Sequence, residues 1–357
     1  MKKMIEVLKN YSFYDKNIEY EKFGNGNINK TYYIKKDGGY IIQEINSSVF
    51  TNPEDIIDNI NKLNEYKDNN RCEIELIKLV KNIKGDFITI IEGEKKKYYR
   101  CYKYIESKVH SMNHFDLNMI YEGGKIIGRF LKEFDGFDYK SLNVIIPNFH
   151  NTKLRYKQFI NEMKQNKYFR KKLCLIECGY LIKNYNLVEN IDEYIRYFKL
   201  RVCHNDTKLS NVLFDKDNKA IALIDIDTIM PGYLIFDYSD GARSCISSLK
   251  EDDINYDDLK IDLNKFYMFT KGFLESTISI ITNEEIECLV DSIIVITYEC
   301  ALRFLTDFLN NDNYFKTNYC YHNLIRTRNQ IKLIEELKNK KNILKNIVNE
   351  LILEIKK

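Results

Sequence analysis

The stretch of sequence that decides the fold spans residues 202–228 and reads VCHNDTKLSNVLFDKDNKAIALIDIDT. Two apolar runs, 211–214 and 221–224, flank a turn sequence at 215–218, and this pattern predicts a β-hairpin. Residues just before the first strand and just after the second therefore meet at one end of the hairpin. We expect five polar side chains to converge there, namely Asp206, Lys208, Asn211, Asp225 and Asp227.

This convergence suits phosphoryl transfer, in which a protein mainly positions the nucleophile, the metal ion and the triphosphate. The Asp206 carboxylate can take a proton from an acceptor hydroxyl. Oxygens of Asn211 and Asp225 can hold Mg²⁺, which accepts one or two protein oxygens together with phosphates and water. The alternative is that these residues only cap turns on a surface hairpin, which accounts for each of them singly but not for the whole set.

The spacing of the motif resembles the catalytic loop and metal-binding motif of the protein-kinase-like superfamily. Here it consists of His204, Asp206 and Asn211, followed by a strand and Asp225. The resemblance implies an α+β, protein-kinase-like fold of two lobes, with a small antiparallel β-rich N-lobe and a larger, mainly helical C-lobe. We interpret His204 as an orienting residue, because the carboxylate two positions later has the placement of the base.

Longer matches narrow the resemblance to the aminoglycoside phosphotransferase and choline kinase superfamily, and within it to the N-acetylhexosamine 1-kinase branch. They are HNDTKLSNVLFD at 204–215, IDIDTIMPG at 224–232, FDYSDGAR at 236–243, YECALRFLTDF at 298–308, GNINKTY at 26–32 and YIIQEIN at 40–46. The resemblance therefore spans both expected lobes.

The resemblance implies roles for individual residues. It makes Asp206 the catalytic base, Lys208 a transition-state charge stabiliser, Asn211 and Asp225 the Mg²⁺ ligands, and it places a sugar pocket near Asp227 and Arg303. The implied reaction transfers phosphate from ATP to the C1 hydroxyl of N-acetylglucosamine or N-acetylgalactosamine.

Several alternatives stay open at the level of sequence. A kinase of the same fold could act on an aminoglycoside, choline, homoserine or another sugar. A nucleotide-binding pseudokinase is a further alternative, against which the intact Asp206, Asn211 and Asp225 argue. Arg303 could also join Glu299 and Asp307, spaced four residues apart, in an ion-pair ladder on a solvent face.

The N-terminal part of the chain reads as a small sheet with one helix. Residues 18–45 alternate strand-like runs with glycine-rich turns at 24–27 and 37–39, and further strands are expected at 87–92 and 97–105. Pro53, followed by two acidic residues, marks the first turn of a helix. We place the nucleotide-binding lobe at 1–105 and the catalytic and substrate-binding lobe at 106–357.

Five residues of the first lobe are predicted to contact the nucleotide: Gly24, Gly26, Asn27, Gln43 and Tyr104. Glycines permit a close approach of backbone N–H groups to phosphates, although two glycines between strands are also ordinary hairpin chemistry. Gln43 is a departure from protein kinases, which carry a Lys on the third strand. An amide can donate a hydrogen bond but brings no charge, so the residue that replaces this Lys is left open.

From residue 115 onward the apolar periodicity is mainly helical, notably over 117–134, 154–169, 190–199, 284–309 and the last 25 residues. Lys and Arg total 55 against 52 Asp and Glu, and the two signs are interspersed, which argues against a nucleic-acid binder. No apolar run is long enough for a signal peptide or a membrane span. Nine cysteines without a C-x-x-C pair fit reduced thiols. We expect a cytoplasmic protein whose partners are a nucleotide and a small sugar, with no protein, membrane or nucleic-acid partner implied.

Overall fold

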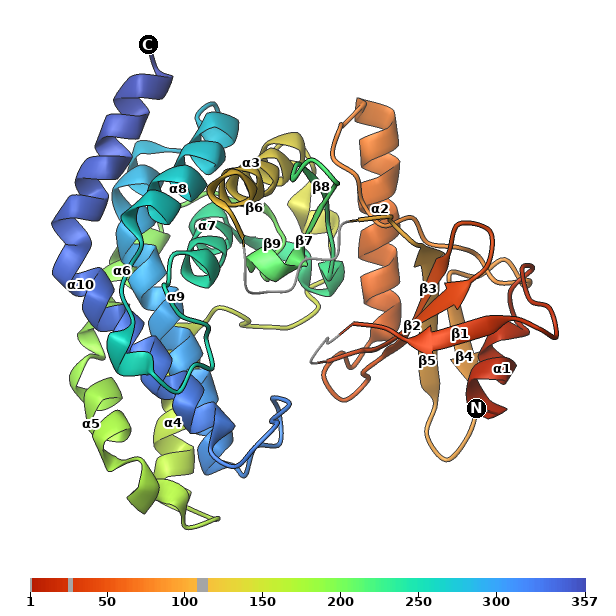
Figure 1. Ribbon diagram of the computed structural model, residues 1–357, viewed down its shortest axis with the longest axis horizontal. Coiled ribbons are helices and arrows are strands. Elements are labelled where there is room, and N and C mark those ends of the chain that lie inside the picture. Colours follow the sequence, from red (N-terminus) through yellow and green to blue (C-terminus); the bar gives the residue numbers. More distant parts are fainter. Residues whose placement is uncertain (1, 25–27, 108–114) are drawn as a thin grey trace.

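The protein folds into two lobes, which the computed structural model shows side by side (Figure 1). The structure describes residues 2–24, 28–107 and 115–357. The small lobe contains a five-stranded antiparallel sheet in the order β1-β2-β3-β5-β4. Its strands are β1 (Glu19–Lys22), β2 (Lys30–Lys35), β3 (Tyr40–Ile45), β4 (Ile88–Ile91) and β5 (Lys97–Lys103).

The turn between β2 and β3 follows from its glycines. Asp37, Gly38 and Gly39 all have positive φ, at 44°, 82° and 94°. A Cβ atom at Gly39 would lie 2.7 Å from the Tyr33 ring, so a side chain is excluded there by space as well as by conformation. The turn therefore fixes the register in which Ile34 pairs with Tyr40.

Two helices complete the small lobe. Helix α1 (Lys2–Leu8) buries Met4, Val7 and Leu8 in a small apolar cluster with side chains of the sheet. Helix α2 (Pro53–Asn70) has its proline in the first turn, as expected, and stands between the sheet and the large lobe (Figure 1).

The large lobe is mainly helical. Its helices are α3 (Leu117–Glu133), α4 (Thr152–Gln165), α5 (Leu175–Lys183), α6 (Asn186–Ile195), α7 (Leu234–Cys245), α8 (Leu263–Thr277), α9 (Asn283–Leu309) and α10 (His322–Ile355). Single 3₁₀ turns lie at η1 (Tyr139–Ser141), η2 (Arg170–Leu173), η3 (Leu209–Asn211), η4 (Ile226–Thr228) and η5 (Tyr256–Asp258). Helix α9 begins with a capping box formed by Thr282 and Glu285, and it is buried along most of its length.

Helices α3 and α8 pack at unusually short range because glycines face each other's backbone. A Cβ at Gly272 would lie 2.1 Å from the carbonyl oxygen of Tyr121, and one at Gly124 would lie 2.1 Å from that of Phe269. Only a residue without a side chain fits at either position.

Four short strands lie between the helices of the large lobe and the small lobe. Strands β6 (Leu200–Cys203) and β9 (Met230–Tyr233) pair antiparallel, and so do β7 (Val212–Phe214) and β8 (Ala220–Leu223). The hairpin predicted at 211–224 is thus present. Asn211 directly precedes the first strand of this hairpin, and Asp225 follows the second strand by one residue.

The main apolar core crosses from one lobe to the other. Ile45, Phe50 and the α2 residues Ile56, Ile60 and Leu63 belong to the same buried cluster as the helices of the large lobe. The division of the chain near residue 105 stays a prediction, and apolar packing continues across it.

The two-lobed α+β fold is confirmed, and most element predictions hold. The helices expected at 117–134 and 284–309 are α3 and α9. The helix expected at 154–169 ends earlier, at Gln165, because Asn166 takes a left-handed conformation with φ 43°. The helix expected at 190–199 instead spans Asn186–Ile195. Among the described residues, no helix has the length and apolar character needed to cross a membrane.

Candidate active site

The loop that follows β6 is held by a buried carboxylate from α7. Asp237 accepts hydrogen bonds from the backbone N–H groups of His204 (2.8 Å) and Asn205 (2.7 Å). Burial raises the pKa of Asp237 to about 7, although the two N–H donors act in the opposite direction. Asn205 has φ 63° and donates through its amide to the carbonyls of Cys203 and Thr228. The loop therefore has one fixed shape.

His204 orients this loop. Its Nδ1 accepts from the backbone N–H of Asp206 (3.3 Å), so the ring proton lies on Nε2, which donates to the carbonyl of Ile224 (3.1 Å). Burial lowers the pKa of His204, in agreement with a neutral ring. Both nitrogens are in use, and the side chain is fully buried. This geometry matches the orienting role that we expected.

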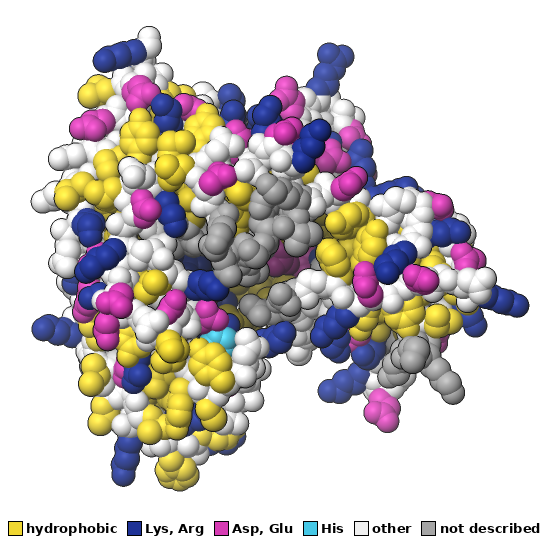
Figure 2. Space-filling model, in the orientation of Figure 1, with side chains coloured by type: hydrophobic (Ala, Val, Ile, Leu, Met, Phe, Trp, Pro, Cys, Tyr) yellow, Lys and Arg dark blue, Asp and Glu magenta, His cyan; other side chains and the backbone are white. Residues whose placement is uncertain are grey.

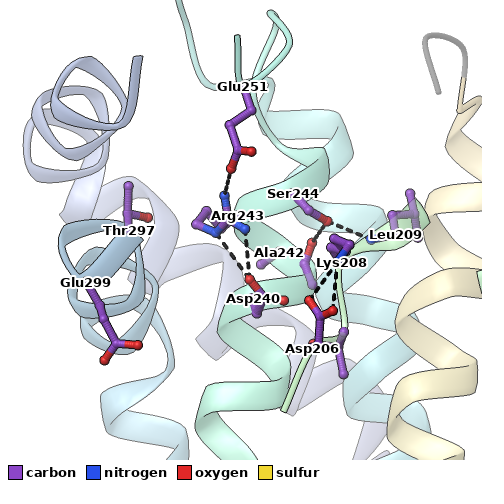
Figure 3. A network of polar contacts seen from close by, with 12 residues as sticks. Asp206, Lys208, Leu209, Asp240, Ala242, Arg243, Ser244, Glu251, Thr297 and Glu299 are labelled. Atoms are coloured by element: carbon purple, nitrogen blue, oxygen red, sulfur yellow. Dashed lines mark hydrogen bonds and ion pairs between the residues drawn. The ribbon is translucent and has the colours of Figure 1, made fainter. Parts of the chain in front are cut away.

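The Asp206 carboxylate lies beside the ammonium group of Lys208 (Figure 3). The carboxylate accepts from Lys208 Nζ at 2.7 and 3.0 Å and from Asn211 Nδ2 at 3.2 Å. Burial disfavours the charge of Asp206, but Lys208 outweighs burial and lowers the pKa of Asp206. The carboxylate is thus ionised at neutral pH and can accept a proton.

Asn211 and Asp225 meet because a backbone hydrogen bond joins their segments. The N–H of Ile224 donates to the carbonyl of Asn211 at 2.9 Å, and Asp225 follows with φ 60°. A left-handed aspartate of this kind stores roughly 1 kcal/mol of strain. Burial raises the pKa of Asp225 to about 6, helped by Asp206 and opposed by Lys208.

The donor set at this point fits a Mg²⁺ ion that is shared with a nucleotide. Asn211 uses its Nδ2 toward Asp206, which leaves its amide oxygen free to act as a ligand beside the Asp225 carboxylate. Within the described ranges there is no group of three or more His, Cys, Asp or Glu side chains that would form an all-protein metal cage. Two protein oxygens completed by phosphates and water are the usual Mg²⁺ environment.

A cavity of about 660 Å³ lies between the lobes and contains Asp206, Lys208, Asn211 and Asp225 in its wall. The hollow between the lobes is visible in the space-filling view (Figure 2). Apolar side chains from both lobes line part of the cavity: Ile28, Ile41, Tyr102 and Ile105 from the small lobe, and Phe115 and Leu213 from the large lobe. An apolar slot of this kind can hold a flat base.

The structure brings three of the five expected nucleotide residues to this cavity. Gly24, Gln43 and Tyr104 lie in its wall, and Gly24 has φ 71°. Gly26 and Asn27 lie outside the described residues. The guanidinium of Arg100, on the neighbouring strand β5, donates to the carbonyl oxygen of Gln43. The local sequence does not predict this contact.

Asp227 does not lie where the expected sugar pocket requires it. Its side chain is 2% exposed, and its two carboxylate oxygens pair with Arg100 and with Asn29 of the small lobe. Of this turn, Asp225 and Thr228 line the cavity, and Asp227 does not. We correct the expectation: Asp227 joins the two lobes and is not part of the acceptor pocket.

Arg303 lies in the wall of the cavity, and the alternative of a solvent-exposed ion-pair ladder is wrong. Glu299 is 1% exposed and binds His150 (3.1 Å) and Thr152 (2.7 Å), whereas Asp307 accepts the backbone N–H groups of Tyr314 and Phe315. Within the described part of the chain, the Arg303 guanidinium has no hydrogen bond or ion pair. It packs instead against the faces of three rings, at 5.4, 5.9 and 5.5 Å from the centroids of Phe149, Tyr314 and Phe315.

His150, which lines the same cavity as Arg303, was not identified from the sequence. His150 reaches Glu299 across 149 positions, which no local pattern signals. Asp240 accepts a hydrogen bond from Arg243 through Oδ1 (2.8 Å). Its Oδ2, however, is buried, has no partner among the described residues, and belongs to a side chain in the cavity wall (Figure 3).

Comparisons with known proteins identify a family and related folds. Residues 19–258 match a family described as "Phosphotransferase enzyme family". Among solved structures, a microcompartment-associated aminopropanol kinase superposes with a TM-score of 0.64 at 11% identity, over 96% of this chain and 98% of that one. An amicoumacin kinase in complex with AMP-PNP and Ca²⁺ gives 0.59 at 13% identity, over 93% and 92% of the two chains. A choline kinase from Cryptosporidium parvum Iowa II gives 0.56 at 14% identity, over 99% of each chain.

Proposed function

This chain belongs to the phosphotransferase enzyme family, and from that premise we propose that it transfers the γ-phosphoryl group of ATP to the C1 hydroxyl of an N-acetylhexosamine. The observation that carries the kinase part of the proposal is the convergence of Asp206, Lys208, Asn211 and Asp225 in one wall of the cavity. A nucleotide in the apolar slot would direct its phosphates toward these four residues.

The protein's own groups supply the proton transfer. Asp206, held by Lys208 and by the amide of Asn211, accepts the proton of the acceptor hydroxyl as that oxygen bonds to the γ-phosphorus and the bond from this phosphorus to the ADP leaving group breaks. Lys208 then remains beside the transferred group, where its charge offsets negative charge that develops on the phosphate oxygens. A Mg²⁺ ion held by Asn211 and Asp225 would add further charge neutralisation at the triphosphate.

The surroundings of Arg303 support a neutral acceptor over a cationic one. Aromatic rings arranged around one point commonly bind quaternary ammonium groups, but here the guanidinium of Arg303 already occupies the three rings. Of the nearby carboxylates, Glu299 pairs with His150, and Asp240 and Glu251 share Arg243. Choline or an aminoglycoside would have to displace the Arg303 guanidinium before its ammonium group could contact these rings.

A sugar can form hydrogen bonds with the polar groups near Arg303 that have no partner among the described residues. Arg303 has free donors for a hydroxyl or acetamido oxygen, and Asp240 Oδ2 is a buried acceptor for a hydroxyl hydrogen. Leaving such groups unpaired is unfavourable by about 1–3 kcal/mol each, so an acceptor that satisfies both is selected over one that cannot. The choice of an N-acetylhexosamine among sugars rests on the resemblance of the sequence motifs.

The test measures both the acceptor and the position of phosphorylation. ADP release is compared for N-acetylglucosamine, N-acetylgalactosamine, glucose, choline, homoserine and kanamycin with Mg²⁺ and ATP. The purified product is then heated in mild acid and the released phosphate is measured. A glycosyl 1-phosphate is hydrolysed because the ring oxygen assists departure at C1, whereas a 6-phosphate survives. An acid-stable product would overturn the 1-kinase assignment, and turnover confined to choline or kanamycin would overturn the sugar assignment.

The variant Arg303→Ala tests the acceptor pocket. Loss of a charged hydrogen-bond donor to the sugar is expected to lower kcat/KM for the acceptor by about ten- to hundredfold, since about 1.5–3 kcal/mol is involved. The KM for ATP should stay close to its original value. An unchanged kcat/KM for the sugar would remove Arg303 from the pocket.

A further inference from the structure

A buried arginine links the small-lobe sheet to the catalytic turn. Arg100 on β5 lies directly opposite Gln43 on β3 in the sheet register. Its side chain is 1% exposed. It donates from Nε (3.0 Å) and from the second terminal nitrogen (2.6 Å) to Gln43 Oε1, while its other terminal nitrogen pairs with Asp227. One guanidinium thus bridges the strand that usually carries a lysine and a turn of the large lobe.

Contact with Arg100 decides which way the Gln43 amide points. A guanidinium only donates hydrogen bonds, so the side of Gln43 that faces it must be the carbonyl oxygen. Gln43 Nε2 is therefore turned the other way, where it donates to Thr31 Oγ1 at 3.0 Å. Both Gln43 and Thr31 lie in the wall of the cavity. The orientation of the Gln43 amide at this wall is thus fixed by a cation on the neighbouring strand.

The second contact of Arg100, with Asp227, is made to the large lobe. Asp227 lies two residues after Asp225, in the turn η4, and small-lobe groups engage both of its carboxylate oxygens. Asn29 donates to Oδ2 at 2.6 Å, and the N–H of Asn46 in turn donates to Asn29 Oδ1 at 3.0 Å. Burial opposes the charge of Arg100, yet Asp227 and, farther away, Asp225 keep the pKa of this guanidinium raised.

We propose that Arg100 replaces the missing third-strand lysine as a positioning residue, which aims the Gln43 amide at the triphosphate and ties the Asp225–Asp227 turn to the small lobe. Arg100 acts only through these two partners, because the guanidinium itself is enclosed behind them. The proposal rests on the proposed function, since it requires a nucleotide at this end of the cavity. It goes beyond that function because it assigns the positive charge that protein kinases carry on the third strand to Arg100 on β5.

The experiment that tests the proposal is a charge swap between neighbouring strands. Binding of Mg²⁺ with AMP-PNP is measured by isothermal titration calorimetry for the wild-type protein, Arg100→Gln, Gln43→Lys and the double variant. Arg100→Gln should weaken binding at least tenfold because it leaves the Asp227 charge without its cation and releases the Gln43 amide. Gln43→Lys should weaken binding as well, because it sets a second cation against Arg100 and removes the acceptor for two of its donors.

The double variant is expected to bind more tightly than either single variant. It restores one cation to this pair of opposed positions, now on the third strand. Arg100→Lys, which keeps the charge but not the forked donors, should fall between Arg100→Gln and the wild type. In steady-state assays the KM for ATP should rise in Arg100→Gln while the KM for the acceptor stays within about twofold.

Arg201→Gln is the matched control, because Arg201 is also 1% exposed and binds a carboxylate, that of Glu285, with both contacts near 3 Å. This variant should lower the melting temperature without weakening AMP-PNP binding. Equal loss of affinity in Arg100→Gln and Arg201→Gln, or wild-type affinity in Arg100→Gln, would overturn the proposal. Additive losses in the double variant would overturn it too. Absence of AMP-PNP binding by the wild-type protein would instead count against the proposed function.

Discussion

At the scale of single residues, Asp206 is the group on which the proposed chemistry depends. Asp206→Asn should lower kcat by about 10²–10⁴-fold, the usual contribution of a general base, because an amide cannot accept the hydroxyl proton. Affinity for Mg²⁺ with AMP-PNP should stay within about twofold, since Asn211 and Asp225 are unchanged. Steady-state kinetics and calorimetry measure the two quantities.

Asp217→Asn is a suitable comparison, because this residue lies on the turn of the same hairpin, away from the cavity wall. It should leave kcat unchanged. More than a tenth of the original kcat in Asp206→Asn would require another base.

His150 gives a pH-dependent contribution to stability. Both ring nitrogens face acceptors, Glu299 Oε1 and the carbonyl of Asn205, each at 3.1 Å, so only the doubly protonated ring satisfies both. Burial opposes this charge, but the hydrogen bond and charge of Glu299 outweigh burial and raise the pKa of His150. Asp240 also raises the pKa and Arg303 lowers it.

The sign of the effect follows from the raised pKa. The folded state binds the proton more tightly than the unfolded state, so the stabilisation is complete below the unfolded value of about 6.5 and is lost as pH rises through the folded value. At pH 6, His150→Gln should reduce the free energy of unfolding by about 1–3 kcal/mol. Urea denaturation at pH 6 and at pH 9 should show a smaller difference between wild type and variant at pH 9, and a constant difference would contradict the assignment.

At the scale of secondary-structure elements, the contact between α3 and α8 makes a prediction about glycines. Gly272→Ala would place a methyl group 2.1 Å from the Tyr121 carbonyl, and overpacking of this kind should destabilise the protein by about 1–3 kcal/mol or more. Gly179 lies in α5 with no atom within 4 Å of an added Cβ. Gly179→Ala should therefore stabilise the protein by about 0.5–1 kcal/mol, since alanine favours a helix. Chemical denaturation of both variants tests the pair, and equal effects would be inconsistent with a close backbone contact.

Elements were predictable from sequence where the signal is local. The hairpin at 211–224, the turn at 37–39 and the helix beginning at Pro53 each depend on neighbours within a few positions. The placement of Asp206, Asn211 and Asp225 at one end of the hairpin followed from strand geometry alone.

Long-range partners were not predictable in the same way. Arg100 and Asp227 come from separate lobes, and nothing near either residue indicates that they pair. The sugar pocket near Asp227 was implied by the family resemblance, and no local pattern in the sequence indicates the contact with Arg100 instead. Arg303 was weighed against an ion-pair ladder for a similar reason: spacing along a helix shows which residues share a face, but not whether that face is buried.

At the scale of the whole molecule, the shared core predicts cooperative unfolding. The apolar cluster joins α2 to the large lobe, and Asn59 on α2 donates to the carbonyls of Asn143 (2.9 Å) and Ile229 (3.0 Å). Unfolding of one lobe would expose part of the core of the other. Differential scanning calorimetry should give one transition with calorimetric and van't Hoff enthalpies that agree. Two separated transitions, or a stable fold for an isolated segment 1–105, would show that the lobes are independent.

The ring cage around Arg303 also bears on how acceptor specificity can change in evolution. The guanidinium acts as a built-in ligand of Phe149, Tyr314 and Phe315, so the protein carries an ammonium-binding box that its own side chain keeps filled. A single mutation that shortens this side chain would empty the box and leave the phosphate-transfer residues of the cavity unchanged in sequence. Acceptors of opposite character, neutral polyols and alkyl ammonium alcohols, are then separated by one substitution on an otherwise unchanged scaffold. A specificity of this kind can be gained or lost far faster than the fold that supports it.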